Sequence, residues 1–451
     1  MPPFVALILC VVLVVGLLRI EHRRNPEASG TLWVPTCWSL LCGSKPLGRW
    51  FESDAILASV ASEEVGSLPD RLVLSILIIL ALLIIYRRRI EWPRILKDNF
   101  WLMLLFLYLG SSILWSDFPL VSFKRWLRLS GMIPIALVVL CEYSPLKALE
   151  SVFRRCAYVL IPFSLLLIKY FPAFGVQYSS WEGIKMWVGV ASQKNGLGVI
   201  CAISTFFIVW TFLREWRAGV FLKIRSQAFA DGLVMVIALF LLRGFRGVYS
   251  ATAIGFLIVG IASLLLLYRM KHNVKHMATV LVLMVVLVLL CLFFGDSLVP
   301  IVTSAFNRDT SFTGRTDIWR AVLDVASLNP LLGVGYGGYW GLQDEMIRST
   351  FLVTEAHSSY LDVYLEVGTV GIVLLLVFLF AFYHKALREL NHAYDWGLFG
   401  ICLLIMSMIH GFTESNFLRT SYFWNSNVLV TVVFSAPSLH QKNEADCYSH
   451  Q

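Results

Sequence analysis

Charged residues are scarce in this chain of 451 residues: Asp, Glu, Lys and Arg together make up 15%, whereas 58% of the residues are hydrophobic. Soluble domains carry about 25% charged residues, so this composition excludes a soluble protein and indicates a polytopic membrane protein. The sequence also lacks Pro/Ser-rich linkers, internal repeats and low-complexity segments. It therefore offers no boundary between separate soluble domains.

Cysteine spacing and glycine context exclude two kinds of site. The nine cysteines are scattered, and the closest pair, Cys37 and Cys42, lacks the CxxC spacing. Most lie in apolar runs, where a thiol is a small buried hydrophobe, so neither a metal site nor a disulfide framework is predicted. The segment GVGYGG (333–338) has no strand before it and no helix after it, which excludes a dinucleotide site and predicts a tightly folded loop. We expect no cofactor.

Long apolar runs alternate with short polar segments along the whole chain. Each run approaches the length needed to cross the hydrocarbon core, and the count is about 12, or 13 if residues 31–43 form a short span rather than a re-entrant segment. The first run has no basic region and no small-residue cleavage site, so we interpret it as a retained span. The runs are residues 2–20, 72–87, 100–115, 129–142, 156–171, 196–213, 230–242, 249–268, 277–295, 367–383, 396–411 and 418–435.

Basic segments set the predicted orientation. Residues 86–97, 213–225, 268–276 and 384–390 are dense in Lys and Arg, and threading the spans in order places all four on one side, which is then the cytoplasm. The net charge of +8 follows from these flanks and does not indicate a nucleic-acid partner. The C-terminus is predicted to be cytoplasmic, and the side of the N-terminus depends on residues 31–43.

The predicted fold is an all-α membrane protein with one large helical loop on the side opposite the cytoplasm. It divides into a transmembrane bundle (1–295), a large outer loop that we expect to be catalytic (296–366), further transmembrane helices (367–437) and a polar cytoplasmic tail (438–451).

Arg315 and His357 are the principal candidates in this loop. Apolar residues recur at helical spacing over 316–326, which predicts an amphipathic surface helix. Arg315 would begin that helix, where an Arg fork and free N–H groups suit phosphate oxygens; a salt bridge to Asp309 or Asp317 is the structural alternative. His357 precedes a helix that continues into the next span, and a His at the membrane surface suits a general base for a hydroxyl.

Several other residues map to the same side as Arg315 and His357. Glu355, Asp362 and Glu366 are carboxylates that could orient His357. RGFRG (243–247) places Arg243 and Arg246 at the membrane edge, although Lys and Arg usually gather on the cytoplasmic side. One interpretation is that the two arginines bind an anion, and the alternative is that they snorkel to lipid phosphate. Outward cations near Arg315 are costly without an anionic ligand, and a diphosphate is the simplest one. The remaining candidates, which could instead be interfacial anchors or helix caps, are Lys124, Arg125, Lys194 and Asn195.

The sequence resembles the O-antigen ligase-like superfamily, which groups O-antigen ligases, Wzy-type polymerases and ExoQ-type exopolysaccharide proteins. The resemblance rests on TGRTDIW (313–319), NPLLGVGYGGYW (329–340) and AHSSYLDVYLEVGTVG (356–371). Further similar segments are LWVPTCWSLLCGSKPLGRW (32–50), LWSDFPLVSFKR (114–125) and WEGIKMWVGVASQKNGLG (181–198). Gln193 and Ser358 stand where the family commonly has His and Asn.

The resemblance implies a GT-C-like glycosyltransferase that moves a glycan from an undecaprenyl-diphosphate carrier to an acceptor hydroxyl. This transfer needs no metal and takes place at the periplasmic face of a bacterial inner membrane. His357 would be the base, and Arg315 with Arg243 or Arg246 would hold the diphosphate. Lys194, Asn195, Lys124, Arg125 and Glu366 would belong to the substrate groove. The expected partners are the lipid-linked glycan, membrane lipid and other polysaccharide-assembly proteins.

Exopolysaccharide or O-antigen polymerisation is the favoured reaction, because the ExoQ-like stretch lies at residues 32–50. Ligation to a lipid A core sugar is the alternative within the enzyme class. A transporter or flippase for lipid-linked oligosaccharide would instead show ionisable groups at mid-membrane, whereas here the polar residues gather on one side. A non-catalytic assembly protein would tolerate Arg315→Ala or His357→Ala.

Overall fold

Helices account for nearly all of the regular structure, which a computed structural model describes for residues 1–51, 67–88, 90–178, 183–219, 225–270, 273–294, 315–340 and 355–436. Seven of the described helices are long and apolar enough to cross a membrane, or eight if a pair bent by 83° counts as one span. The seven are α1 (Pro3–Arg24), α5 (Leu68–Arg87), α10 (Pro145–Tyr170), α12 (Lys194–Arg217), α14 (Ala251–Arg269), α19 (Ser359–Glu389) and α20 (Tyr394–Thr413). The chain is therefore a multi-pass membrane protein.

Further helices complete the bundle. The bent pair is α6 (Trp92–Asp98) and α7 (Phe100–Ser111), which continues as the 3-10 turn Ser112–Trp115. The others are α2 (Trp33–Gly43), α3 (Gly48–Phe51), α8 (Pro119–Ser130), α9 (Met132–Leu140), α11 (Pro172–Gly175), α13 (Arg225–Leu242), α15 (Val274–Phe294), α17 (Arg315–Ala326) and α21 (Tyr422–Val433).

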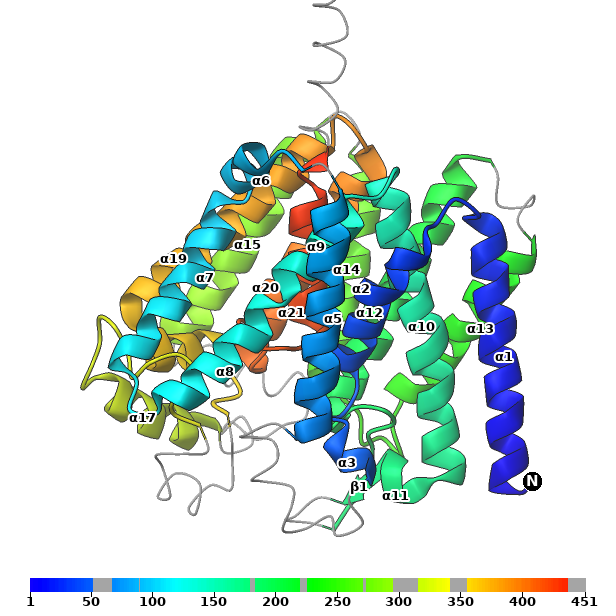
Figure 1. Cartoon of the computed structure of the whole chain (residues 1–451), viewed down its shortest axis with the longest axis horizontal. Coiled ribbons are helices and arrows are strands. Elements are labelled where there is room, and N and C mark those ends of the chain that lie inside the picture. Colours follow the sequence, from blue (N-terminus) through cyan, green and yellow to red (C-terminus); the bar gives the residue numbers. More distant parts are fainter. Residues whose placement is uncertain are drawn as a thin grey trace, which may run out of the picture.

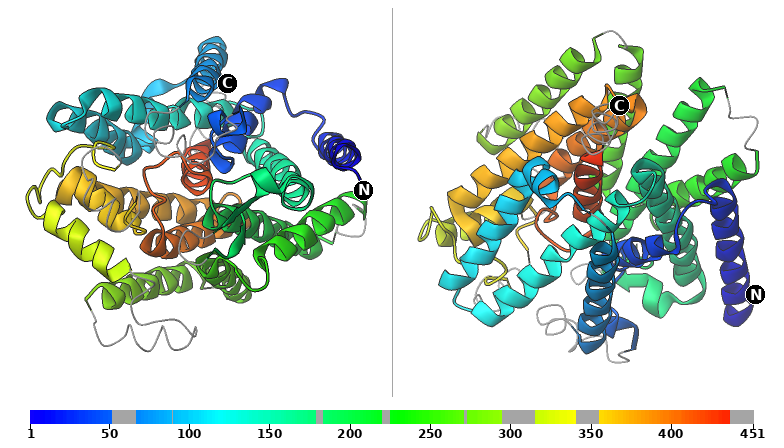
Figure 2. Two further views of the ribbon diagram at one scale, coloured as in Figure 1. Left: turned by 90° about the horizontal axis from the view of Figure 1, so that it is seen from below. Right: turned by 45° about the horizontal axis from the view of Figure 1, so that its top comes forward.

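The span count stays a prediction, because several apolar runs form helices too short to cross alone. The 11 residues of α2 rise only about 16 Å, roughly half of the hydrocarbon thickness. This helix packs against α10, α9 and α21, and its Trp38 is fully buried. Every residue of α21 is buried, so this helix runs inside the bundle. Figure 2 shows α21 in the middle of the bundle and α1 at its edge.

The two ends of the bundle differ in charge. The C-terminal ends of α5, α12, α14 and α19 carry basic residues and lie opposite α17 (Figure 1). This arrangement agrees with the predicted grouping of the basic segments on one side. We call this end the basic face and the other end the α17 face. The N-terminus lies on the α17 face (Figure 1).

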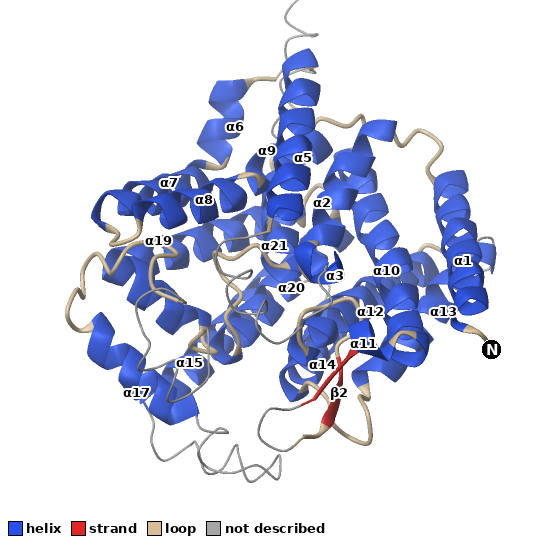
Figure 3. Ribbon diagram, turned by 60° about the horizontal axis from the view of Figure 1, so that its bottom comes forward, coloured by secondary structure: helices blue, strands red, loops and turns tan. Residues whose placement is uncertain are grey.

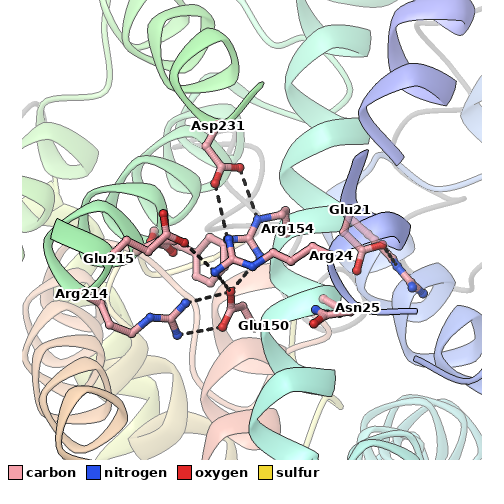
Figure 4. Close-up of polar contacts among 12 residues, drawn as sticks. Glu21, Arg24, Asn25, Glu150, Arg154, Arg214, Glu215 and Asp231 are labelled. Carbon is pink, nitrogen blue, oxygen red and sulfur yellow. Dashed lines mark hydrogen bonds and ion pairs between the residues drawn. The ribbon is translucent and has the colours of Figure 1, made fainter. Parts of the chain in front are cut away.

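Buried ion pairs join the helices near the basic face (Figure 4). Arg154 of α10 lies 2.9 Å from Glu150 and 3.3 Å from Asp231 of α13. Arg214 at the end of α12 contacts Glu150 at 2.8 Å, and Arg24 at the end of α1 contacts Glu215 at 2.6 Å. Buried charges are stable only when they are paired in this way. The network therefore fixes α12 and α13, whose opposite ends lie on the α17 face.

On the α17 face, a small hairpin and a kinked helix shape the surface. The antiparallel strands β1 (Val176–Tyr178) and β2 (Lys185–Trp187) lie beside α11 and α12 (Figure 3). Helix α17 forms where the amphipathic pattern predicted a helix and packs against α19, and hydrogen-bonded turns follow it as far as Asn329. Helix α19 runs from the α17 face into the bundle and is interrupted at Gly368, where φ is 65° and ψ is −167°.

Candidate active site

A polar cavity of about 330 Å³ opens where four distant segments meet on the α17 face. Its walls are the end of α2 (residues 41–46), the start of α12, the connection between α20 and α21, and Glu355 before α19. Arg128 of α8 closes a further side. The cavity therefore lies where helix ends from both halves of the chain converge.

Carboxylates and an amide surround His357 at one end of this cavity. The Nδ1 atom of His357 lies 3.3 Å from Glu355 Oε1 and 3.5 Å from Glu414 Oε2. The side-chain amide of Asn195, in the first turn of α12, donates a hydrogen bond of 2.7 Å to Glu414 Oε1. Glu355 and Glu414 line the cavity, whereas His357 is not among its lining residues and adjoins it through these two carboxylates. Two carboxylates at Nδ1 orient the ring and leave Nε2 as the atom that can accept a proton.

Burial affects Glu355 strongly. It raises the pKa of the Glu355 carboxyl, and the neighbouring Glu414 and Asp362 carboxylates act in the same direction. His357 and Arg419 oppose this shift but do not cancel it. Glu355 therefore shares its surroundings with a second carboxylate and can hold a proton at a higher pH than an exposed Glu.

Asp362 holds the backbone at His357. Its Oδ1 accepts hydrogen bonds from the backbone N–H of Ala356 at 3.1 Å and the indole N–H of Trp340 at 2.9 Å. From the other side, the indole of Trp319 in α17 donates to the carbonyl of Ala356 at 2.9 Å. His357 itself has φ of 51°, an uncommon conformation for a residue other than glycine. Such a conformation persists only where its surroundings fix it, and it is frequent at active sites.

Two arginines supply the positive charge of the cavity lining in the described part of the chain. Arg128 comes from α8, and Arg419 comes from the connection between α20 and α21. Arg419 Nη2 donates to Asp362 Oδ2 at 3.0 Å. Burial lowers the pKa of Arg419, but the carboxylates of Asp362, Glu366 and Glu355 outweigh this effect and raise it. Arg419 is therefore positively charged at every physiological pH.

The glycine-rich segment folds tightly against α19, as predicted. Gly335 and Gly337 have φ of 97° and 63°, and the N–H of Gly337 donates to Glu366 Oε2 at 3.1 Å. The guanidinium of Arg125 donates to the carbonyl of Gly337 at 2.5 Å and to that of Trp340 at 3.4 Å. Arg125 and Glu366 thus fix this loop beside the cavity, instead of lining it.

The remaining predicted residues lie in different places. Lys194 begins α12 beside Asn195, and Lys124 is exposed on α8. Arg243 and Arg246 are exposed in the turn between α13 and α14, apart from the cavity lining. The side chain of Arg315 lies outside the described part of the structure, although its backbone begins α17 as predicted.

Sequence reasoning missed Glu414 and Arg419, and it named Arg128 only as one of the outward cations of residues 115–129, without a role in the site. Glu414 and Arg419 lie in the polar interruption TESNFLRTS (413–421) between two apolar runs. This interruption was the available signal, since polar groups between spans on one side gather at one surface. No spacing rule connects it to Asn195, which is 219 positions away.

A divalent metal is one ligand that this geometry permits. Donor atoms of Glu355, His357 and Glu414 all lie within 4.8 Å of one another. Two carboxylates and an imidazole are a common donor set for transition metals. The expectation of metal-free chemistry therefore stays a prediction.

The fold and cavity define a multi-pass helical membrane protein with a polar site at one membrane surface. Residues 232–376, which include the second half of α13, the glycine-rich segment and His357, match the family model described as O-antigen ligase (Wzy_C). The chain is also 24% identical over 330 residues to the exopolysaccharide production protein ExoQ of Rhizobium meliloti (strain 1021), covering 70% of this chain and 72% of that protein. Both matches support the resemblance to the O-antigen ligase-like superfamily seen in the motifs of the chain.

Proposed function

We propose that the protein polymerises exopolysaccharide or O-antigen repeat units by moving a glycan from an undecaprenyl-diphosphate carrier to the hydroxyl of a second lipid-linked unit. The observation that carries this proposal is one cavity lined both by the carboxylates of Glu355 and Glu414, which contact His357, and by the cations Arg128 and Arg419. The carboxylates suit sugar hydroxyls, and the arginines suit phosphate oxygens.

In the proposed reaction, His357 takes the proton of the acceptor hydroxyl. The hydroxyl oxygen attacks the anomeric carbon, and the bond between that carbon and the diphosphate oxygen breaks, leaving its electron pair on the diphosphate. Glu355 and Glu414 stabilise the imidazolium that forms. Arg128 and Arg419 stabilise the charge that grows on the leaving diphosphate. The single displacement inverts the anomeric configuration without a covalent intermediate.

The residues predicted from the sequence enter this proposal in two groups. Arg315, with Arg243 or Arg246, would guide or hold the diphosphate from the membrane side. Asn195 orients Glu414 through its hydrogen bond, and Lys194 and Lys124 would contact the glycan where it leaves the cavity. The α17 face would be periplasmic and the basic face cytoplasmic, in a bacterial inner membrane. Other polysaccharide-assembly proteins would act beside it.

Analysis of glycans after deletion of the gene distinguishes the possible acceptors. Accumulated single repeat units on the carrier support polymerisation. Full-length polymer retained on the carrier would instead identify a ligase that uses a lipid A core sugar. Repeat units confined to the cytoplasmic leaflet would identify a flippase and overturn the proposal. The ExoQ relative, described as an exopolysaccharide production protein, favours the first outcome.

A further inference from the structure

A second cavity of about 630 Å³ lies between α10, β2 and α13. Apart from two lysines its lining is apolar, and it includes Ile168, Trp187, Val236, Phe240 and Phe245. The indole of Trp187 packs against Phe240 at 5.4 Å and Phe245 at 6.2 Å. None of its lining residues also lines the active-site cavity. The two cavities are thus separate sites, and we call this one the α10–α13 groove.

The groove is open toward lipid. Val236 and Phe240 of α13 are 62% and 46% exposed, which is the exposure expected for side chains that face hydrocarbon. Trp187 and Tyr170 lie near its end on the α17 face, where aromatic side chains typically mark the membrane interface. A hydrocarbon chain can therefore enter the groove directly from the bilayer.

Three cations surround this apolar surface. Lys169 ends α10 and is exposed, and Lys185 belongs to β2. The Nζ of Lys185 lies 5.0 Å from the centre of the Phe245 ring, and the guanidinium of Arg246 lies 5.4 Å from the same ring. Among the described residues, none of these three cations has a carboxylate within 4.0 Å. Their charge thus calls for an anion from outside the described residues.

The position of these cations is unusual for a membrane protein. Lys185 belongs to β2, which lies on the α17 face (Figure 3), and Lys169 and Arg246 follow the ends of α10 and α13 that reach the same face. The basic C-terminal ends of α5, α12, α14 and α19 lie at the opposite face. Cations at this face run against the usual charge bias and are costly unless an anion compensates them. A lipid phosphate attached to hydrocarbon chains matches both the charge and the apolar floor.

We propose that the α10–α13 groove binds an anionic phospholipid of the surrounding leaflet. Its phosphate contacts Lys169 and Lys185, and its acyl chains lie on Trp187 and Phe240. The occupant is a phospholipid and not the donor carrier, because the proposed function places the diphosphate of the donor in the separate active-site cavity. This site is independent of the proposed reaction.

Native mass spectrometry of the purified full-length protein tests this site. The probes are phosphatidylglycerol and phosphatidylcholine with identical acyl chains. Phosphatidylglycerol should bind about 30-fold more tightly, because each lysine near an anionic lipid contributes roughly fivefold. A Lys169→Gln, Lys185→Gln double variant should bind the two lipids equally, whereas Lys147→Gln, at the other end of α10, should behave as wild type. Phe240→Ala should weaken binding of both lipids.

Three results would overturn the proposal. The wild-type protein could bind both lipids equally, or the double variant could keep the preference for phosphatidylglycerol. Polyprenyl phosphate could also displace phosphatidylglycerol from the wild type at equal concentration, which would assign the groove to the carrier. Because these measurements follow lipid binding and not glycan synthesis, they do not depend on the proposed function.

Discussion

Replacing Glu414 by Gln removes a negative charge beside His357 while keeping nearly the same shape. The amide oxygen of Gln can still accept the hydrogen bond from Asn195, which is 2.7 Å long in the native protein. The contact that changes is the one between His357 Nδ1 and Glu414 Oε2, at 3.5 Å. The substitution therefore tests whether this carboxylate stabilises a protonated His357.

Coulomb's law gives the size of the effect. Unit charges 3.5 Å apart attract by about 1 kcal/mol in water and about 5 kcal/mol at an effective dielectric constant of 20. The Glu414 side chain is 5% exposed and that of His357 is 23% exposed, so the site lies between these limits. A loss of about 2 kcal/mol lowers the rate about 30-fold. Glu355 continues to support the imidazolium, which keeps the loss below that of removing His357.

Initial rates of polymer formation from lipid-linked repeat units in nanodiscs measure this effect. We expect Glu414→Gln to lower kcat about 30-fold, with little change in KM, because the charge acts on a group that is protonated during the reaction. Glu91→Gln is the control, since Glu91 lies at the start of α6 and its side chain is 47% exposed. A Glu414→Gln enzyme with the wild-type rate would refute the role given to this carboxylate.

Four further predictions follow from the site. Asp362→Asn should destabilise the protein by about 2 kcal/mol, because Arg419 loses its hydrogen-bond partner at 3.0 Å. Adding Arg419→Gln should lower the unfolding free energy little further. Unfolding in mixed detergent measures the stability of the single and the double variant. Arg128→Gln should raise KM for the lipid-linked donor about 10-fold without loss of stability, measured by initial rates. Gly368→Ala should destabilise by more than about 2 kcal/mol in the same unfolding assay, because φ is 65° and a Cβ would lie 2.2 Å from the carbonyl oxygen of Leu331. Burial raises the pKa of Glu355 above its usual 4.5, so the native state keeps a proton that the unfolded chain releases. The unfolding free energy should therefore fall as pH rises from about 4.5. Glu355→Gln should remove this dependence on pH.

Each of these has a clear contrary result. Additive losses for Asp362→Asn and Arg419→Gln would show that the two side chains act independently. An unchanged KM for Arg128→Gln would remove this residue from donor binding, and a Gly368→Ala protein as stable as wild type would show that α19 relaxes without cost. A pH slope that persists in Glu355→Gln would belong to another group.

Local patterns in the sequence sufficed for several elements near the site. The amphipathic spacing over 316–326 predicted α17, and the glycines of 333–338 predicted a tight loop because their positive φ values depend on residue type. The helix after His357 followed from its continuity with an apolar run. These features depend on neighbouring residues along the chain, which is the information that a pattern contains.

Contacts between distant segments could not be predicted in this way. Asn195 and Glu414 meet because α12 and α20 end at the same face, and nothing in either segment specifies the other. The pairing of Asp362 with Arg419 depends in the same way on how α19 packs beside the connection after α20. A carboxylate near His357 was expected, but only the packing identifies which ones face it.

The number of spans illustrates a different limit of prediction from sequence. Apolar runs predict burial in either lipid or protein, and the runs that form α2, α9 and α21 are buried mainly against other helices. A helix enclosed by protein need not match the thickness of the bilayer, so its length cannot be inferred from hydrophobicity alone.

The most direct test of the account is a polymerisation assay on purified His357→Ala in nanodiscs, with lipid-linked repeat units as both donor and acceptor. Wild type should form polymer, and His357→Ala should bind the donor normally but react at least about 10²-fold more slowly, the usual contribution of a general base. His357→Gln should stay equally slow, because an amide holds no proton during transfer. A His357→Ala enzyme that forms polymer at the wild-type rate would contradict the assignment of His357 as the base.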